Sequence, residues 1–158
     1  MELQDRLRER AAALPKDWNM VKIEAVREKA ARAAAWLDNV ELILSLPEEK
    51  LLANSRDRDL ASFHLFLAAQ ECTDLVAHWI AGRHWDIPDD AASAFDLLVD
   101  RAAIDRDLAI RLRATICLRD HIAQGDLIED YAAVQGEYRE GIASLRRFLT
   151  AVAAEAGL

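Results

Sequence analysis

The sequence predicts an all-α protein, folded as an antiparallel bundle of four to five main helices. Of its 158 residues, 53% are hydrophobic but only 6% are aromatic, and the chain has only 5 Gly and 3 Pro. A chain rich in Ala, Leu, Ile and Val and poor in turn-forming residues favours helices. No stretch alternates with a period of two and no Asn-Gly hairpin signal occurs, so strands are not predicted. We expect residues 1–158 to form one domain, because this length can bury a substantial core.

The first long helix is predicted from about Asp17 to Leu46. Its apolar residues follow one another at alternating spacings of three and four, which is typical of a helix packed lengthwise against a neighbour. They are Ile23, Val26, Ala30, Ala33, Leu37, Val40 and Leu44. Pro15 closes the charged, helix-prone stretch before this helix. We therefore expect at most a loosely attached amino-terminal helix over residues 1–16.

The second main helix is predicted after Pro47, which ends the first one. Asp57 or Asp59 is expected to cap its amino terminus, because Asp side chains accept hydrogen bonds from the first free amides of a helix. Gly82 is expected to stop the helix, since glycine tolerates the left-handed conformation found there.

Three more helices complete the predicted bundle. They are expected over about 88–101, 105–123 and 127–155, with Gly125 as the break before the last. In the last helix, four apolar side chains recur every seven residues, namely Tyr131, Tyr138, Leu145 and Val152. Long apolar seams of this kind commonly leave a face that a second copy covers, so we expect a homodimer.

Charge and cysteine content restrict the function classes. The formal net charge of −8 repels a polyanion, which excludes broad, sequence-independent coating of DNA. Cys72 and Cys117 have no CxxC partner and follow no signal peptide, so we expect reduced thiols in a cytoplasmic protein. The most apolar run, 60–81, contains too many polar residues for a membrane span. Nucleotide-binding and hydrolase signatures are absent, and no cofactor is predicted.

One face of the second main helix carries four side chains that can bind a metal or transfer protons. His64, Glu71 and His78 lie seven residues apart, and Asp74 falls within roughly 60° of Glu71. These groups predict either a metal-binding helical bundle or a buried polar stripe that hydrogen-bonds to neighbouring helices. A bundle metal site takes ligands from at least two helices, and no second ExxH motif occurs, which favours the polar stripe.

Cys117 and His121 are four residues apart and form a minimal nucleophile and base. No third group or oxyanion device accompanies them. Because Cys117 sits in the apolar run 116–118, the sequence favours a small core residue over a catalytic thiol.

The run from Gln70 to Asp126 resembles the HepT-like branch of the HEPN superfamily. That branch carries a Q-E-C-x-D-x-x-x-H helix, a Pro, an A-F-x-L-L block, an I-D turn before an L-A-x-x-L helix, and finally R-N-x-I-A-H-G-Y. The matching residues here are Gln70, Glu71, Cys72, Asp74, His78, Pro88, Ala94, Phe95, Leu97, Leu98, Ile104, Asp105, Leu108, Ala109, Leu112 and Arg119. The resemblance extends as helix order from Glu24 to about Val152.

This resemblance implies an all-helical HEPN-like homodimer whose paired active sites cut RNA without metal. Such proteins are commonly toxins whose antitoxin is a minimal, MntA-like nucleotidyltransferase. In the family the motif Arg binds the scissile phosphate, the His transfers protons and the Tyr is nucleotidylated. Arg119 matches the Arg, but Asp120 replaces the Asn, Gln124 the His and Asp126 the Tyr.

These replacements predict weak or lost ribonuclease activity. An amide does not titrate near neutral pH, so Gln124 cannot transfer protons as an imidazole does. Asp120 and Asp126 add negative charge where a phosphate would bind. We therefore expect a toxin-antitoxin protein that acts through dimerisation and a nucleotidyltransferase-type partner.

Two alternatives remain open. One is an active endoribonuclease toxin that uses Arg119 and His121, with Asp74 or His78 in support. The other is the metal-binding bundle described above.

Overall fold

The computed structural model describes residues 16–123 and 131–158, and every regular element within these ranges is a helix. The helices are α2 (Lys16–Leu44), α3 (Glu48–Ala53), α4 (Ser55–Gly82), α5 (Ala91–Asp100), α6 (Arg106–Ala123) and α7 (Tyr131–Ala156). The predicted all-α fold class is confirmed. The expected helix over 1–16 and the predicted break at Gly125 lie outside the described residues, apart from Lys16, where α2 begins.

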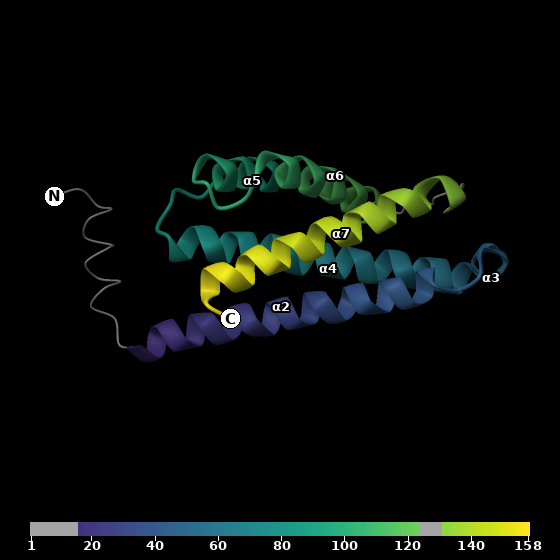
Figure 1. Ribbon diagram of the computed structural model, residues 1–158, viewed down its shortest axis with the longest axis horizontal. Coiled ribbons are helices and arrows are strands. Elements are labelled where there is room, and N and C mark those ends of the chain that lie inside the picture. The colour runs from purple at the N-terminus through teal and green to yellow at the C-terminus, as the bar shows by residue number, and fades with distance from the viewer. Residues whose placement is uncertain (1–15, 124–130) are drawn as a thin grey trace.

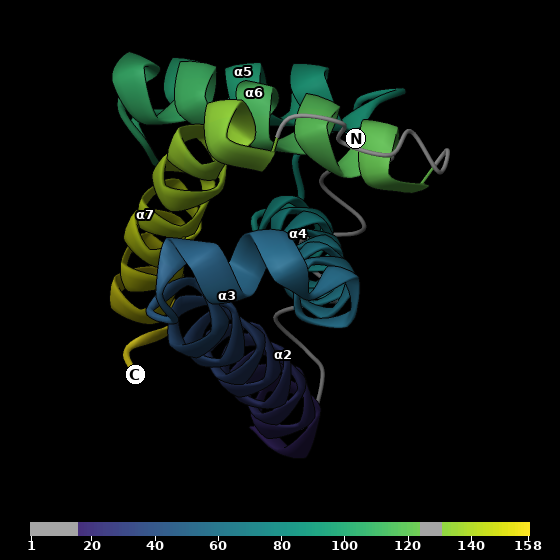
Figure 2. The same cartoon turned by 90° about the vertical axis from the view of Figure 1, so that its right-hand side faces the viewer.

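The helices form a bundle in which α2 and α4 lie side by side over most of their length (Figure 1). The short helix α3 joins them at one end (Figure 2). Helices α5 and α6 form a second pair, and α7 packs against α2, α4 and α6 (Figures 1 and 2). No described helix is long and apolar enough to cross a membrane.

The predicted apolar seams are buried over most of their length, but Ile23, at the start of the first seam, is 40% exposed. The side chain of Tyr131, at the start of the second, lies outside the part of the chain that the structure describes. Leu37 and Val40 of α2 are completely buried, and Leu44 is 2% exposed. In α7, Tyr138 is completely buried, and its hydroxyl lies 2.6 Å from the Ser62 hydroxyl of α4. Burying side chains of this size stabilises the fold by about 1.5–3 kcal/mol each, which explains why the seams determine how the helices pack.

The start of α4 differs from the prediction, because Asn54 caps it rather than Asp57 or Asp59. The Asn54 side-chain oxygen accepts hydrogen bonds from the amides of Arg56 at 3.1 Å and Asp57 at 3.3 Å. The reason is the unpredicted helix α3, which fills the expected connector and leaves Asn54 as the extended residue between two helices.

The end of α4 also differs from the prediction. Gly82 is the last helical residue, and the left-handed residue is His84, with φ 57°. The amide of Trp85 donates to the carbonyl of Ile80 at 3.1 Å, and the amide of His84 donates to that of Ala81 at 3.1 Å. These two bonds form a Schellman motif, which satisfies the last carbonyls and outweighs the cost of a left-handed histidine.

Candidate active site

Arg119 lies near the carboxyl end of α6 and its side chain extends toward α4. Its Nη1 donates a hydrogen bond to Oε1 of Gln70 at 3.1 Å. Its Nε and Nη2 donate to one carboxylate oxygen of the adjacent Asp120, at 3.1 and 2.6 Å. The Arg119 side chain is 19% exposed, so the guanidinium is largely withdrawn from solvent and held from two sides.

The contacts of Arg119 continue through Gln70 into a network across α4 and α2. The amide nitrogen of Gln70 lies 3.5 Å from Asp74, whose other oxygen pairs with Lys29 at 3.3 Å. Lys29 also pairs with Glu71 at 3.5 Å. Arg32 contacts the second oxygen of Glu71 at 3.3 Å.

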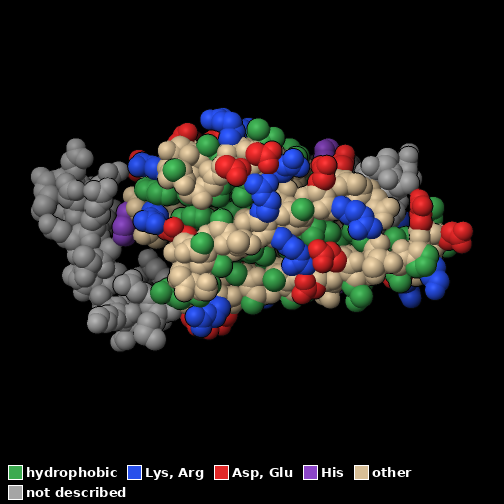
Figure 3. Space-filling view, in the orientation of Figure 1, with side chains coloured by type: hydrophobic (Ala, Val, Ile, Leu, Met, Phe, Trp, Pro, Cys, Tyr) green, Lys and Arg blue, Asp and Glu red, His purple; other side chains and the backbone are tan. Residues whose placement is uncertain are grey.

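This network contains three cations and three carboxylates, namely Arg119, Lys29, Arg32, Asp120, Asp74 and Glu71. Its charges therefore balance, and no surplus positive charge is available for a polyanion. Acidic and basic side chains are likewise interspersed over the face of the molecule in Figure 3, and the described part of that face has no broad basic patch. Each of the three cations in this network therefore already pairs with a carboxylate.

His121 lies on a different side of α6 from Arg119. It is exposed and lines a groove of about 590 Å³ between α6 and α7, together with Cys117 and Glu137. Arg119 does not line this groove, because its side chain is directed at Gln70 of α4. The structure therefore separates the two residues that the alternative ribonuclease mechanism would combine.

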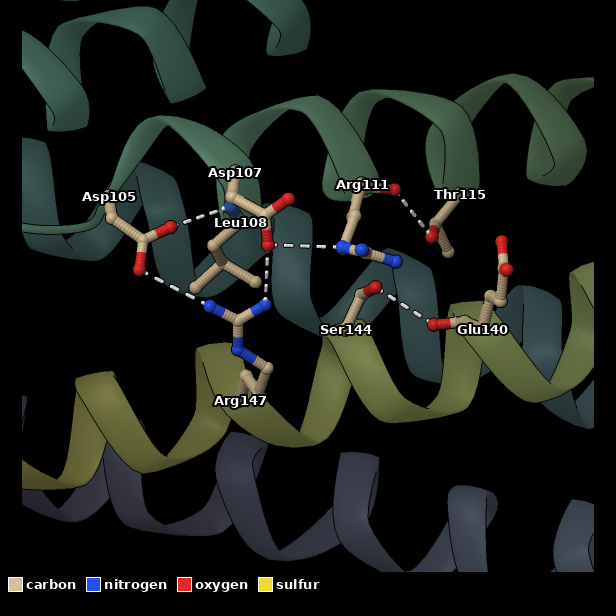
Figure 4. Close-up of polar contacts among 8 residues, drawn as sticks. All are labelled: Asp105, Asp107, Leu108, Arg111, Thr115, Glu140, Ser144 and Arg147. Atoms are coloured by element: carbon tan, nitrogen blue, oxygen red, sulfur yellow. Dashed lines mark hydrogen bonds and ion pairs between the residues drawn. The ribbon is translucent and has the colours of Figure 1, made fainter.

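Ion pairs join α6 to α7 beside this groove, whose lining includes Asp107 and Arg111 of α6 (Figure 4). Arg147 of α7 donates to Asp107 at 3.1 Å and to Asp105 at 3.2 Å, and Arg111 donates to Asp107 at 3.0 Å. Hydrogen bonds from Arg147 and Arg111 lower the pKa of the Asp107 carboxyl. The Arg147 contacts join α6 to α7, the Arg111 contact lies within α6, and both guanidinium groups are engaged.

The polar face of α4 does not converge on one point. His64 packs against Trp36, with ring centroids 4.8 Å apart, and burial lowers the pKa of His64. His78 is exposed and lines a separate pocket beside Trp79. Among the described residues, no group of three or more His, Cys, Asp or Glu side chains is placed to hold a metal ion.

Both cysteines are free thiols, but their environments differ. Cys72 is completely buried in the core, and burial raises the pKa of its thiol. Cys117 is exposed, which corrects the prediction that it is a small core residue. The local apolar run was misleading because Cys117 faces away from α4, toward the groove side of α6.

Two motif positions lie outside the described residues, namely Gln124 and Asp126. Of the remaining predicted site residues, the structure brings Arg119, Asp120 and Asp74 into one network through Gln70, whereas His121 and His78 lie apart from it. Sequence reasoning missed Lys29, because no local pattern pairs this α2 residue with carboxylates 42 and 45 positions away.

Comparison with known families agrees with this helix order and motif. The family profile described as "Ribonuclease HepT-like" matches residues 35–152, which is most of the chain. The chain belongs to the HepT-like family. No curated protein matches this HepT-like chain in sequence.

Solved structures share the fold of this HepT-like protein. One is a mutant of the toxin–antitoxin MntA-HpeT, 18% identical, with a TM-score of 0.73 over 82% of this chain and 98% of that chain. Another is the tri-AMPylated HEPN toxin of Shewanella oneidensis in complex with MNT antitoxin, 15% identical, with a TM-score of 0.75 over 82% of this chain and 97% of that chain. A toxin–antitoxin with AMP-PNP matches with 16% identity and a TM-score of 0.74, over 83% and 98% of the two chains.

Proposed function

We propose that this HepT-like protein is a cytoplasmic member of a toxin-antitoxin module whose ribonuclease activity is weak or lost. It acts as a homodimer and binds a nucleotidyltransferase-type antitoxin. Family membership and the shared fold with toxins crystallised in complex with MntA or MNT antitoxins support the module.

The observation that carries the low activity is the pairing of Arg119 with Asp120. Where the family motif has a neutral Asn, this chain has a carboxylate whose oxygen accepts two hydrogen bonds from Arg119, at 3.1 and 2.6 Å. These are the donors that would bind a phosphate, since Arg recognises carboxylate and phosphate by the same fork. Asp120 therefore competes with a phosphate for Arg119.

The proton-transfer step has lost its imidazole as well. Gln124 occupies the motif His position. General acid–base catalysis contributes roughly a hundredfold to ten-thousandfold to the rate, and the amide of Gln124 cannot supply it. His121 is the nearest His in the sequence, but it lines the α6–α7 groove, on another side of α6 from Arg119. The two losses act on different steps, so they compound.

An exposed apolar surface on α4 supports the homodimer. Phe63 is 53% exposed and Leu60 is 44% exposed, and the rings of Phe63 and Phe66 stack with centroids 6.5 Å apart. Phe63 lies seven residues before Gln70 and so shares its helix face. A second copy that covers this surface lies beside the Arg119 network, and it removes large apolar side chains from water.

The experiment is RNA cleavage by purified protein in EDTA. The wild type is expected to be silent or weak, and a Gln124→His, Asp120→Asn, Asp126→Tyr triple variant is expected to gain cleavage that Arg119→Ala abolishes. Strong wild-type cleavage that both Arg119→Ala and His121→Ala remove would instead establish the active endoribonuclease. Stoichiometric zinc or manganese in the purified protein would favour the metal-binding bundle.

The dimer is tested by light scattering after size-exclusion chromatography. Phe63→Glu is expected to give a monomer, whereas Ile87→Glu, at a loop position that is 72% exposed, is expected to leave the dimer intact. A wild-type monomer at micromolar concentration would contradict the proposed homodimer.

A further inference from the structure

Gln70 lies between a cation and an anion that belong to different contacts of the site. Its amide oxygen accepts from Nη1 of Arg119 at 3.1 Å, and its amide nitrogen lies 3.5 Å from Oδ1 of Asp74. We infer that Gln70 is a positioning residue that holds the Arg119 guanidinium in the orientation needed to bind an RNA phosphate. This inference rests on the proposed function, because it assigns a role at the same site.

The chemistry of both neighbours determines how the Gln70 amide is oriented. A guanidinium can only donate hydrogen bonds and an ionised carboxylate can only accept them, so the amide oxygen faces Arg119 and the amide nitrogen faces Asp74. A Glu at position 70 would neutralise Arg119 and repel Asp74, and a Leu would offer neither bond. A neutral side chain with both an acceptor and a donor satisfies the two neighbours without consuming the charge of Arg119.

The anchor behind Gln70 is held from α2. Lys29 contacts Asp74 at 3.3 Å and Glu71 at 3.5 Å, and its side chain is only 21% exposed. The amide of Gln70 is thus tied through Asp74 to a second helix. A guanidinium held by this series of contacts loses little further conformational freedom when it binds a ligand, and such preorganisation raises affinity.

Gln70 and Asp120 engage opposite ends of the guanidinium. Gln70 accepts from Nη1, whereas Asp120 accepts from Nε and Nη2. Replacing the carboxylate of Asp120 by a neutral amide therefore weakens its hold on Nε and Nη2, which can then bind a phosphate, while Gln70 still accepts from Nη1. The Asp120→Asn protein is the background in which positioning by Gln70 becomes measurable.

The test is a double-mutant cycle in the Asp120→Asn protein, read as affinity for a fluorescein-labelled 2′-O-methyl RNA 12-mer at low salt. Gln70→Leu is expected to weaken binding by roughly tenfold, the effect of losing one hydrogen bond to a charged group. Once Arg119→Ala is present, Gln70→Leu is expected to change nothing further. The matched control is Gln135→Leu, the same substitution at a Gln of α7. It is expected to leave the RNA affinity of the Asp120→Asn protein unchanged.

A purely structural role for Gln70 predicts a different result. The loss caused by Gln70→Leu would then be equal with and without Arg119→Ala, and that result would overturn the inference. If Arg119→Ala weakens binding but Gln70→Leu does not, the positioning role alone fails. If Arg119→Ala itself leaves RNA affinity unchanged, the phosphate contact of the proposed function fails together with it.

Discussion

Replacing Asp120 by Asn is expected to increase the affinity of this protein for RNA. The substitution keeps the shape of the side chain and removes its charge, so it separates electrostatics from packing. In the wild type, Arg119 must leave a carboxylate oxygen 2.6 Å from its Nη2 before it can bind a phosphate. The change also restores the neutral residue type of the family motif.

The magnitude follows from two terms. Asp120 is 51% exposed, so breaking its ion pair costs about 0.5–1 kcal/mol. If two anions that contact the same guanidinium are taken as about 6 Å apart, removing the charge of Asp120 contributes about 1 kcal/mol more, at a dielectric constant between those of water and a protein surface. The total of about 1.5–2 kcal/mol corresponds to roughly a 10- to 30-fold gain in affinity.

The assay is fluorescence anisotropy with the labelled 2′-O-methyl RNA at low salt. Asp96→Asn is the matched control, because it changes the net charge by the same amount. Like Asp120, Asp96 is about half exposed, at 53%, and pairs with an Arg, here Arg113 at 3.2 Å. A gain for Asp120→Asn that Asp96→Asn does not reproduce supports the masking of Arg119. Equal gains would show a net-charge effect, and an unchanged or lower affinity for Asp120→Asn would refute the reasoning.

Three further predictions follow from the burial of particular groups. In the native protein, iodoacetamide should alkylate the exposed Cys117, whereas the buried Cys72 should react only after unfolding, as measured by mass spectrometry. Rapid labelling of both thiols would contradict the burial of Cys72 in the core. Phe148→Ala should lower the free energy of unfolding in urea by about 3–5 kcal/mol, because Phe148 is completely buried, and a loss under 1 kcal/mol would show that the site is not tightly packed. Burial lowers the pKa of His64 in the folded protein, so its contribution to stability is present above the unfolded pKa near 6.5 and is lost as pH falls from there toward the folded pKa. In urea unfolding, the free energy of unfolding of His64→Phe should therefore decline less between pH 7 and 5 than that of the wild type. An equal decline would assign the pH dependence to other groups.

The apolar seams of α2 and α7 were predictable, because the residues that one helix face buries recur at regular spacings in the sequence. Leu37, Val40 and Tyr138 are buried where the spacing of three, four and seven placed them. The starts and ends of helices were less predictable, since they depend on competition between neighbouring groups. Asn54 caps α4 because an additional helix intervenes, and His84 takes the left-handed position after Gly82.

The candidate site was predictable in its residue types but not in its connections. The motif pointed to Arg119 and Asp120, and the stripe on α4 pointed to Asp74. That these groups join through Gln70 depends on how α6 lies against α4, and that Lys29 anchors them depends on α2. Such contacts between distant segments follow from tertiary packing, which no local spacing encodes.

The proposed function requires the RNA-cutting centre of this HepT-like protein to be largely silent. Its most direct test is the rate at which the purified wild type cleaves single-stranded RNA in EDTA, measured beside the Gln124→His, Asp120→Asn, Asp126→Tyr variant. The wild-type rate is expected to be lower than that of the variant by at least about a hundredfold, the minimum contribution of general acid–base catalysis. A wild-type rate equal to that of the variant, abolished by Arg119→Ala, would contradict it.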